Sequence, residues 1–350
     1  MRDSTILIRN VHVMLAYAFR AIHSKASDRI AGERFDHLHD LLAEILLRGV
    51  GTQVKRGLNR DYLLRRDELS TVRGRIDIGR TVATRSMTRG RLACEFDEYE
   101  LDTLYNQALK AVMVLLLRHG DVSLQRKDAL RRLLPYLDPV TLIAPTSIRW
   151  NLLSHHRANA DYRLLLGVCE LIVRGLLPTD DAGALKLRSW ASDDAMSMLY
   201  ERFLRGYFSI HHPDLLPSAS AVAWDYDETS AIGADQLPAM RTDLTLRRGA
   251  RSLIIDAKYY GRTTQMNQWG KETVHSSNLY QILAYARNAD VARNGSVSGL
   301  LLYARTDADK QPHVDVVIQG NRIGARTLDL NLSWADLRAQ LEDVVTWLDR

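Results

Sequence analysis

Two aspartates and one lysine in the second half of the chain have the types and spacing that metal-assisted chemistry requires: Asp243, Asp256 and Lys258. They lie in a segment where two β-rich runs flank the dipeptide Gly249-Ala250. Glycine at the first central position suits a two-residue type II′ hairpin turn. In the register that this turn sets, Asp243 lies directly opposite Asp256. The same register pairs apolar residues on one core face: Leu246 with Leu253, and Leu244 with Ile255.

Carboxylates that face each other across a hairpin are close enough to share one cation. Directly paired Cβ atoms lie ~4.5–5.5 Å apart, and two negative charges so close repel each other unless a cation lies between them. Mg²⁺ takes oxygen ligands, usually one or two carboxylates together with waters and a substrate phosphate. Strand alternation places Lys258 on the same face as Asp256, ~6.6–7 Å further along. The three groups predict metal-assisted phosphodiester hydrolysis, in which Lys258 stabilises charge or helps to deprotonate the attacking water.

A simpler interpretation is that Asp256 and Lys258 form a surface ion pair. Asp-x-Lys is a common strand tripeptide, and an exposed pair of this kind contributes little to stability. Two observations favour the site instead. Asp243 faces Asp256 in the predicted register, and the apolar run at 253–255 indicates that the charges are surrounded by core residues.

The elements around this hairpin predict an α/β domain with a small mixed sheet. Its helices are expected at 195–208, 272–287 and from 334 onwards, and its strands near 240–247, 252–259, 299–303, 314–318 and 327–330. The first half predicts helices near 11–22, 36–46, 101–117, 122–137 and 160–177, with short strands near 62–64, 75–78 and 92–96. A polar stretch at 179–192 separates the two parts. We therefore expect two domains, residues 1–180 and 181–350.

Composition and charge favour a cytoplasmic protein with a polyanionic partner. The sequence has no apolar run near the ~20 residues that span a bilayer and no secretory signal, so no membrane association is expected. Cys94 and Cys169 follow no metal spacing and are expected to pack as small apolar side chains. The net charge is +5. Between Lys55 and Arg91, ten arginines and Lys55 outnumber four acids, which indicates either a solvated surface or a region that binds phosphate or a partner.

The sequence contains neither the phosphate-binding loop of GTPases nor a zinc-binding motif. No Gly-x₄-Gly-Lys-Ser/Thr loop is present, so the chain is not expected to bind GTP itself. The histidine pairs at 155–156 and 211–212 lack zinc-binding spacing. We expect these histidines on the surface or in loops.

The residues of the hairpin resemble a known nuclease signature. Asp243, a gap of twelve residues and then Asp256-Ala-Lys258 are similar to the motif of PD-(D/E)xK nucleases, and residues 278–285 resemble the Gln-x-x-x-Tyr helix of their RecB-like branch. More closely, the chain resembles the McrC family, the nuclease subunits of McrBC modification-dependent restriction systems. The matching stretches are scattered along the chain, at residues 9–18, 73–76, 256–260, 275–281 and 299–303.

This resemblance implies a fold and an activity. It implies a C-terminal restriction-endonuclease-like mixed sheet flanked by helices, preceded by a mixed α+β domain that docks on a partner. The activity would be Mg²⁺-dependent cleavage of DNA that carries modified (methylated) cytosine. The partner would be a McrB-like AAA+ GTPase hexamer, and the arginine-rich segment is our hypothesis for the contact that stimulates GTP hydrolysis. The alternative is a non-catalytic DNA-binding and GTPase-stimulating subunit with a degenerate nuclease fold, which the intact Asp243, Asp256 and Lys258 disfavour.

The resemblance also indicates supporting residues in the site. Glu201 would be a third acidic ligand from the helix that precedes the hairpin, although a solvated helix glutamate fits the sequence equally well. Gln281 and Tyr285 are four residues apart and share a helix face, which His275 and Asn278 extend. That face would orient the phosphodiester, or it would be a polar exterior stripe.

Overall fold

A computed structural model describes the following residues: 4–19, 37–153, 162–176, 192–227, 229, 231–259, 264–266, 272–305 and 311–349. The chain forms two compact units: unit 1 combines residues 1–42 with residues 170–350, and unit 2 contains residues 43–169. This division differs from the predicted boundary near residue 180. Most of the loop expected at 179–192 lies outside the described residues.

The N-terminal helix explains why both ends of the chain belong to one unit. Helix α1 (Ser4–Ala18) packs along helix α8 (Asp193–His211). The rings of Tyr17 and Phe203 meet edge to face, with centroids 5.8 Å apart. A Cβ atom at Gly206 would lie 2.2 Å from the carbonyl oxygen of Tyr17, so the two backbones approach where only a glycine fits. Because this contact joins distant parts of the chain, no local sequence pattern predicts it.

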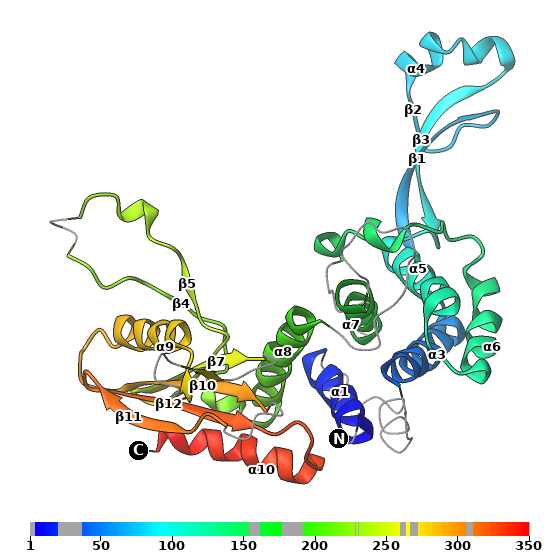
Figure 1. The fold of residues 1–350 in the computed structure, drawn as a ribbon. Helices are drawn as coiled ribbons and strands as arrows, with labels where there is room; N and C mark the ends of the chain where they lie inside the picture. The colour runs from blue at the N-terminus through cyan, green and yellow to red at the C-terminus, as the bar shows by residue number, and fades with distance from the viewer. Residues whose placement is uncertain are drawn as a thin grey trace. The chain divides into compact units, whose positions relative to one another are not determined.

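The core of unit 1 is a five-stranded mixed sheet, as the sequence predicted (Figure 1). In spatial order its strands are β11 (Val314–Ile318), β12 (Asn321–Leu328), β10 (Val297–Ala304), β7 (Arg251–Lys258) and β6 (Leu244–Arg248). The three central strands run parallel to one another, and each edge strand is antiparallel to its neighbour. Strand β10, at the centre, is buried along its whole length, which explains its apolar run.

Helices cover both faces of this sheet (Figure 1). Helix α9 (Ser276–Ala289) packs on one face through Ile282, Tyr285 and Ala286, against a cluster that includes Ile254 of β7. Helix α10 (Trp334–Val345) and the short helix η9 (Thr346–Leu348) contact the sheet as well. A Cβ atom at Gly324 of β12 would lie 2.1 Å from the ring of Trp347, whereas its neighbour Ile323 belongs to the cluster under α9. Since adjacent strand residues point to opposite faces, η9 covers the face away from α9.

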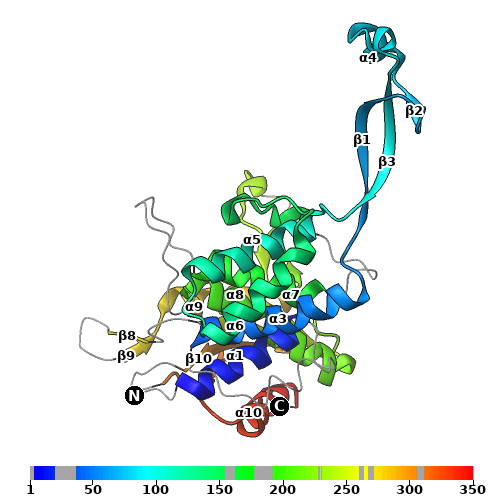
Figure 2. The same ribbon diagram turned by 90° about the vertical axis from the view of Figure 1, so that its right-hand side faces the viewer.

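Unit 2 is a group of helices with a long hairpin, which Figures 1 and 2 show extending from them. The helices are α3 (Leu38–Arg56), in which the chain enters the unit, α5 (Leu104–His119), α6 (Leu124–Leu133) and α7 (Tyr162–Leu171). The arm comprises residues 61–100: strands β1 (Asp61–Leu69) and β3 (Leu92–Glu100) pair along their whole length, and strand β2 (Arg75–Ile76), helix α4 (Ile78–Ala83) and the short helix η1 (Ser86–Arg89) lie between them.

Several short elements complete the described part of the chain. They are the strand pairs β4 (Ala221–Val222) with β5 (Met240–Arg241) and β8 (Thr264–Met266) with β9 (Glu272–Val274). The prediction of a helix from residue 272 was wrong by four residues, because the β-branched Thr273 and Val274 extend in β9. In the described ranges, no helix combines the length and apolar character needed to cross a bilayer. The two cysteines are buried and unbonded, as predicted.

Candidate active site

The hairpin of β6 and β7 has the predicted register. Leu244 pairs with Ile255, Leu246 with Leu253, and Arg248 with Arg251. Gly249 has a φ of +58°, and Ala250 does not adopt a positive φ, which is the pattern of a type II′ turn. The turn chemistry and the apolar pairs are therefore confirmed.

The two aspartates lie together at the end of this hairpin. Asp243 immediately precedes β6, and its Oδ2 accepts a hydrogen bond of 2.8 Å from the backbone N–H of Ala257. Each of the carboxyl groups of Asp243 and Asp256 shifts the pKa of the other, so the two groups lie close together. Asp256 is only 2% exposed, and Asp243 is half-buried. The juxtaposition expected from the register is therefore present, and it lies among core residues rather than on an open surface.

Lys258 links the acidic pair to helix α9. Its Nζ lies 2.7 Å from Oδ2 of Asp256 and donates a hydrogen bond of 3.1 Å to Oε1 of Gln281. Gln281 in turn donates through Nε2 to the hydroxyl of Tyr285, at 2.9 Å. The predicted helix face of Gln281 and Tyr285 thus points at the lysine, and the alternative of a polar exterior stripe does not describe these two residues.

Burial raises the pKa of every carboxyl group in this cluster. For Asp256, burial is the largest cause and raises the pKa to about 6, while Lys258 lowers it and Asp243 raises it again. Burial also raises the pKa of Asp243, against the opposing effects of the Ala257 N–H and of Lys258. The folded protein therefore keeps two acidic groups where their charged forms are disfavoured, and a bound cation would relieve that cost.

Glu201 belongs to the same electrostatic cluster. It is half-buried on α8, and its pKa is raised first by burial and then by the negative charge of Asp243. Glu201 and Asp243 line one open cavity of about 350 Å³. Glu201 is therefore not a fully solvated glutamate. However, in the part of the chain that the structure describes, no three histidine, cysteine or acidic side chains are grouped closely enough to hold a metal ion.

The acidic pair is better suited to a hard divalent cation that keeps several waters than to a metal ion enclosed by protein ligands alone. Mg²⁺ is usually held by one or two carboxylates and keeps several waters, so two aspartates are a sufficient protein contribution. Oδ2 of Asp256 is buried and has no hydrogen bond of good geometry, although Lys258 is near it. An acceptor oxygen in this state is suited to ligation.

Other residues of the predicted site have structural roles. Asn278 does not extend the polar face, because it is buried and donates to the hydroxyl of Tyr303 at 3.0 Å. The ring of Tyr259 lies 6.3 Å from that of Tyr200 of α8, and Tyr260 lies outside the described residues. Besides Glu201 and Asp243, residues of the cavity wall were not predicted, including Arg205 and Arg241. The four-residue spacing of Glu201 and Arg205 was their one signal in the sequence.

His211 and His212 each contact a side chain of another element. His211 is the last residue of α8, His212 follows it as the C-cap, and both are partly exposed. Nε2 of His211 contacts the hydroxyl of Tyr17 at 2.8 Å, and Nε2 of His212 contacts Glu342 at 2.9 Å. The pair at 155–156 lies outside the described residues.

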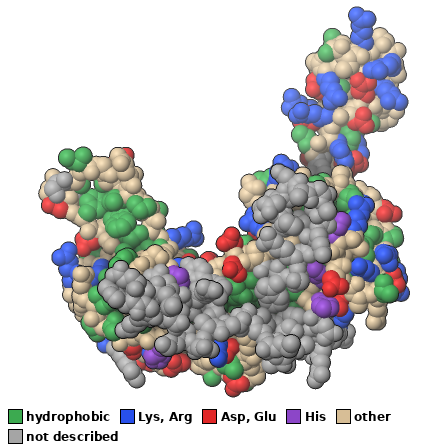
Figure 3. Space-filling view, in the orientation of Figure 1, with side chains coloured by type: hydrophobic (Ala, Val, Ile, Leu, Met, Phe, Trp, Pro, Cys, Tyr) green, Lys and Arg blue, Asp and Glu red, His purple; other side chains and the backbone are tan. Residues whose placement is uncertain are grey.

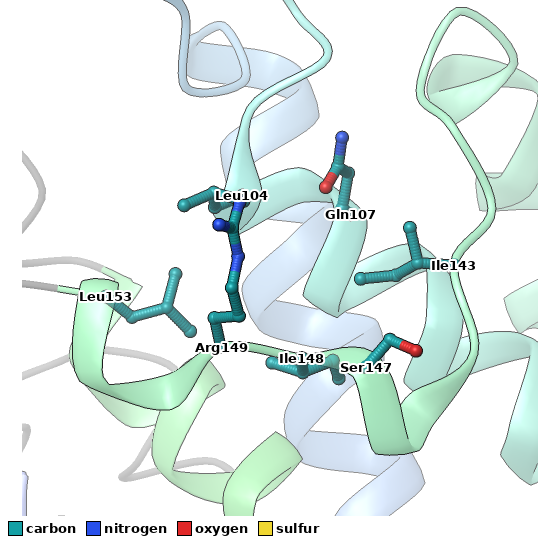
Figure 4. Close-up of a pocket in the computed structure, with 7 residues that line it drawn as sticks. All are labelled: Leu104, Gln107, Ile143, Ser147, Ile148, Arg149 and Leu153. Carbon is teal, nitrogen blue, oxygen red and sulfur yellow. The ribbon is translucent and has the colours of Figure 1, made fainter.

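Unit 2 contains a smaller cavity of a different kind (Figure 4). Its volume is about 120 Å³, and Figure 4 labels its lining residues: Leu104, Gln107, Ile143, Ser147, Ile148, Arg149 and Leu153. Arg149 is the one charged residue among these seven. Without a carboxylate, a histidine or a cysteine, this lining offers no catalytic base and no metal ligand.

The arm carries most of the arginine-rich segment, and Figure 3 shows basic side chains gathered along it. Four of its arginines form ion pairs with acids of the arm: Arg65 with Glu100, Arg66 with Glu95, Arg73 with Glu98, and Arg89 with Glu68. Four others are exposed and have no ion pair with any described residue: Arg75, Arg80, Arg85 and Arg91. They surround apolar side chains that are also exposed, such as Ile78 and Val82 of α4.

Comparison with known proteins identifies relatives over nearly the whole chain. The family model of the McrBC 5-methylcytosine restriction system component matches residues 4–304. The type IV methyl-directed restriction enzyme EcoKMcrBC of Escherichia coli (strain K12) is 27% identical over 351 residues, covering 98% of each chain. Among solved structures, an assembly of Thermococcus gammatolerans McrB AAA+ hexamers with bound McrC has a TM-score of 0.48 at 17% identity, covering 95% of this chain and 76% of that one. A McrBC complex of the same organism has a TM-score of 0.42 at 19% identity and covers 59% of each chain.

Proposed function

The chain belongs to the family of the McrBC 5-methylcytosine restriction system component, and from this premise we propose that it is the subunit that cleaves DNA. The observation that carries the proposal is the pairing of half-buried Asp243 with buried Asp256, with the Nζ of Lys258 at 2.7 Å from the second aspartate. Two acids and an amine at one strand end are the groups that metal-dependent phosphodiester hydrolysis needs.

We propose that Asp243 and Asp256 hold Mg²⁺. The raised pKa of both groups supports this proposal, since a cation would favour their charged forms. When bound, such a cation would supply positive charge against the phosphodiester and lower the pKa of the attacking water. Glu201 is close enough for its pKa to respond to both aspartates, and we assign it an outer position that tunes their charge.

Lys258 would act directly on the substrate. Its ammonium group is a compact cation that can donate to a phosphate oxygen or to the attacking water. Asp256 and Gln281 hold the Nζ from two sides, and Tyr285 fixes Gln281. This chain of contacts restricts the lysine to one orientation, so its ammonium group would already be positioned when a substrate phosphate binds.

The family points to an assembly rather than to a lone enzyme. The similar Thermococcus gammatolerans assembly is described as McrB AAA+ hexamers with bound McrC. We propose that this chain likewise acts with an AAA+ GTPase hexamer on DNA that carries methylated cytosine. The exposed arginines of the arm, with the apolar Ile78 and Val82 beside them, are the surface that we assign to that partner, because guanidinium groups can stabilise phosphate charge in trans.

The test is an isosteric change of the buried aspartate, Asp256→Asn, in the reconstituted complex. We expect DNA cleavage to fall to background, while assembly with the GTPase and stimulation of GTP hydrolysis persist. The matched control is Asp235→Asn, which changes an exposed aspartate of unit 1 and should leave cleavage intact. Retained cleavage in Asp256→Asn would falsify the site. If the wild-type complex itself does not cleave DNA, the alternative of a non-catalytic subunit is favoured.

A further inference from the structure

The cavity beside Asp243 has a composition that neither an apolar ligand nor a metal ion explains. Its volume is about 350 Å³, and six polar residues of α8 and of the segment that leads into β6 line it: Glu201, Arg202, Arg205, Arg241, Thr242 and Asp243. Three guanidinium groups thus face two carboxyl groups. Pockets for small ligands measure ~300–1,000 Å³, so this one is large enough for part of a nucleotide.

The three arginine side chains differ in the contacts that they make within the protein. Arg202 pairs with Glu170 at 2.9 Å and lies 5.6 Å from the ring centroid of Phe19, so its position has a structural explanation. Arg205 uses its Nε to donate to the backbone carbonyl of Asp243, at 3.2 Å. Arg241 is exposed, and its guanidinium group makes no hydrogen bond or ion pair with any residue that the structure describes.

The charge of the cavity favours an anion. The three guanidinium groups that line it outnumber the two carboxyl groups. A cation bound to Asp243 would neutralise one of those carboxylates and increase the excess of positive charge. Guanidinium binds phosphate through paired hydrogen bonds.

We infer that Arg205 and Arg241 bind a backbone phosphate of the DNA strand, next to the phosphodiester that is cleaved. This inference rests on the proposed nuclease function and names a substrate subsite within it. Arg205 contacts both the cavity and the backbone of Asp243, so phosphate binding and the position of the metal-binding aspartate are coupled. Arg241 would attract the phosphate through its positive charge, without a contact to Asp243 like that of Arg205.

Metal-free DNA binding by the full chain tests the assignment separately from catalysis. We would measure the anisotropy of a labelled duplex with EDTA present, over a series of salt concentrations, for the wild type and Arg241→Gln. Each phosphate contact contributes ~0.9 to the slope of log K against log salt concentration. We expect Arg241→Gln to bind more weakly and to lose about that much of the slope.

The control is Arg251→Gln, which removes the same charge at the other end of β7. Arg251 is five residues from Asp256 along an extended strand, ~16 Å away. It should keep the wild-type slope. Equal slopes for the two variants, or a wild type that binds no duplex, would overturn the inference. Asp256→Asn separates the two proposals: it should keep the full slope but lose cleavage, so retained cleavage would count against the nuclease site and leave the phosphate site standing.

Discussion

The buried carboxyl of Asp256 should make the metal-free protein less stable at alkaline pH than at acidic pH. Its pKa rises from the usual 3.8 to about 6 on folding, mainly through burial. Because the folded value is the higher one, the folded protein binds more protons than the unfolded chain between these two values. Stability therefore falls as the pH rises through this window, and the loss persists above it.

The size of this effect follows from the change in pKa. At ~1.4 kcal/mol per pKa unit, a rise from 3.8 to about 6 corresponds to ~3 kcal/mol of destabilisation above pH 7. Asp243 and Asp256 shift each other's pKa, so the two groups share this free energy and the figure applies to the pair. The change Asp256→Asn removes the charge while it keeps the shape of the side chain.

The assay is urea unfolding of the wild type and Asp256→Asn in EDTA, at pH 5 and pH 8. The difference between the two proteins cancels the titrating groups that do not interact with Asp256. We expect Asp256→Asn to gain on the wild type by ~3 kcal/mol at pH 8 and by about half as much at pH 5, where the unfolded carboxyl is already ionised. Mg²⁺ should stabilise the wild type at pH 8, and Asp256→Asn should respond less. A difference that is the same at both pH values would refute the argument, and so would equal stabilisation of both proteins by Mg²⁺.

Three further changes test the packing, the support of the lysine and the arm. Gly206→Ala should destabilise the protein by ~1–3 kcal/mol in urea unfolding, because its Cβ would meet the Tyr17 carbonyl at 2.2 Å, whereas Gly51→Ala has open space and should not. Tyr285→Phe frees Gln281, and should lower kcat for DNA cleavage roughly 2- to 10-fold, as expected for one hydrogen bond; an unchanged kcat would show that Gln281 needs no support. The double change Arg80→Ala and Arg85→Ala should reduce stimulation of the partner's GTPase, and Arg66→Ala, whose guanidinium is paired with Glu95, should have a smaller effect. Full stimulation by every such variant would remove the arm from the partner contact.

The hairpin of the site was predictable because its determinants are local. A glycine suited to a type II′ turn fixes the register, and the register fixes which residues face each other. The positions of Asp243, Asp256 and Lys258 follow from those two facts. Their catalytic and metal-binding roles stay predictions until cleavage is measured.

The elements that the sequence did not reveal depend on distant partners. Strand β12 begins at Asn321, six residues before the predicted start, and it includes two arginines. Arg322 looks like a surface residue, but it pairs with Asp315 and stacks on Trp347 at 3.8 Å. The strands of the arm are longer than predicted, because the residues of β1 at 65–67 and of β3 at 97–100 are charged or partly exposed and show no apolar alternation.

The cavity arginines were missed for the same reason. Arg205 and Arg241 are 36 positions apart in the chain, and only the packing of α8 against β6 and β7 brings them to one cavity. No spacing rule connects a helix residue to a residue that precedes a strand. Residues on one helix face or one hairpin can be related from the sequence, but residues on two packed elements cannot.

The division of the chain bears on how the protein is made. Unit 2 is an insertion: its residues 43–169 leave the ribosome as one uninterrupted stretch, whereas unit 1 must wait for its last strands and helices before α1 can be enclosed. Unit 1, which holds the proposed site, would therefore be the last part to mature, after the arm has formed. A truncated chain that starts at residue 181 would lack α1 and would expose the aromatic side of α8 to water. Such a fragment should aggregate, and supplying residues 1–42 on a separate peptide should restore its solubility.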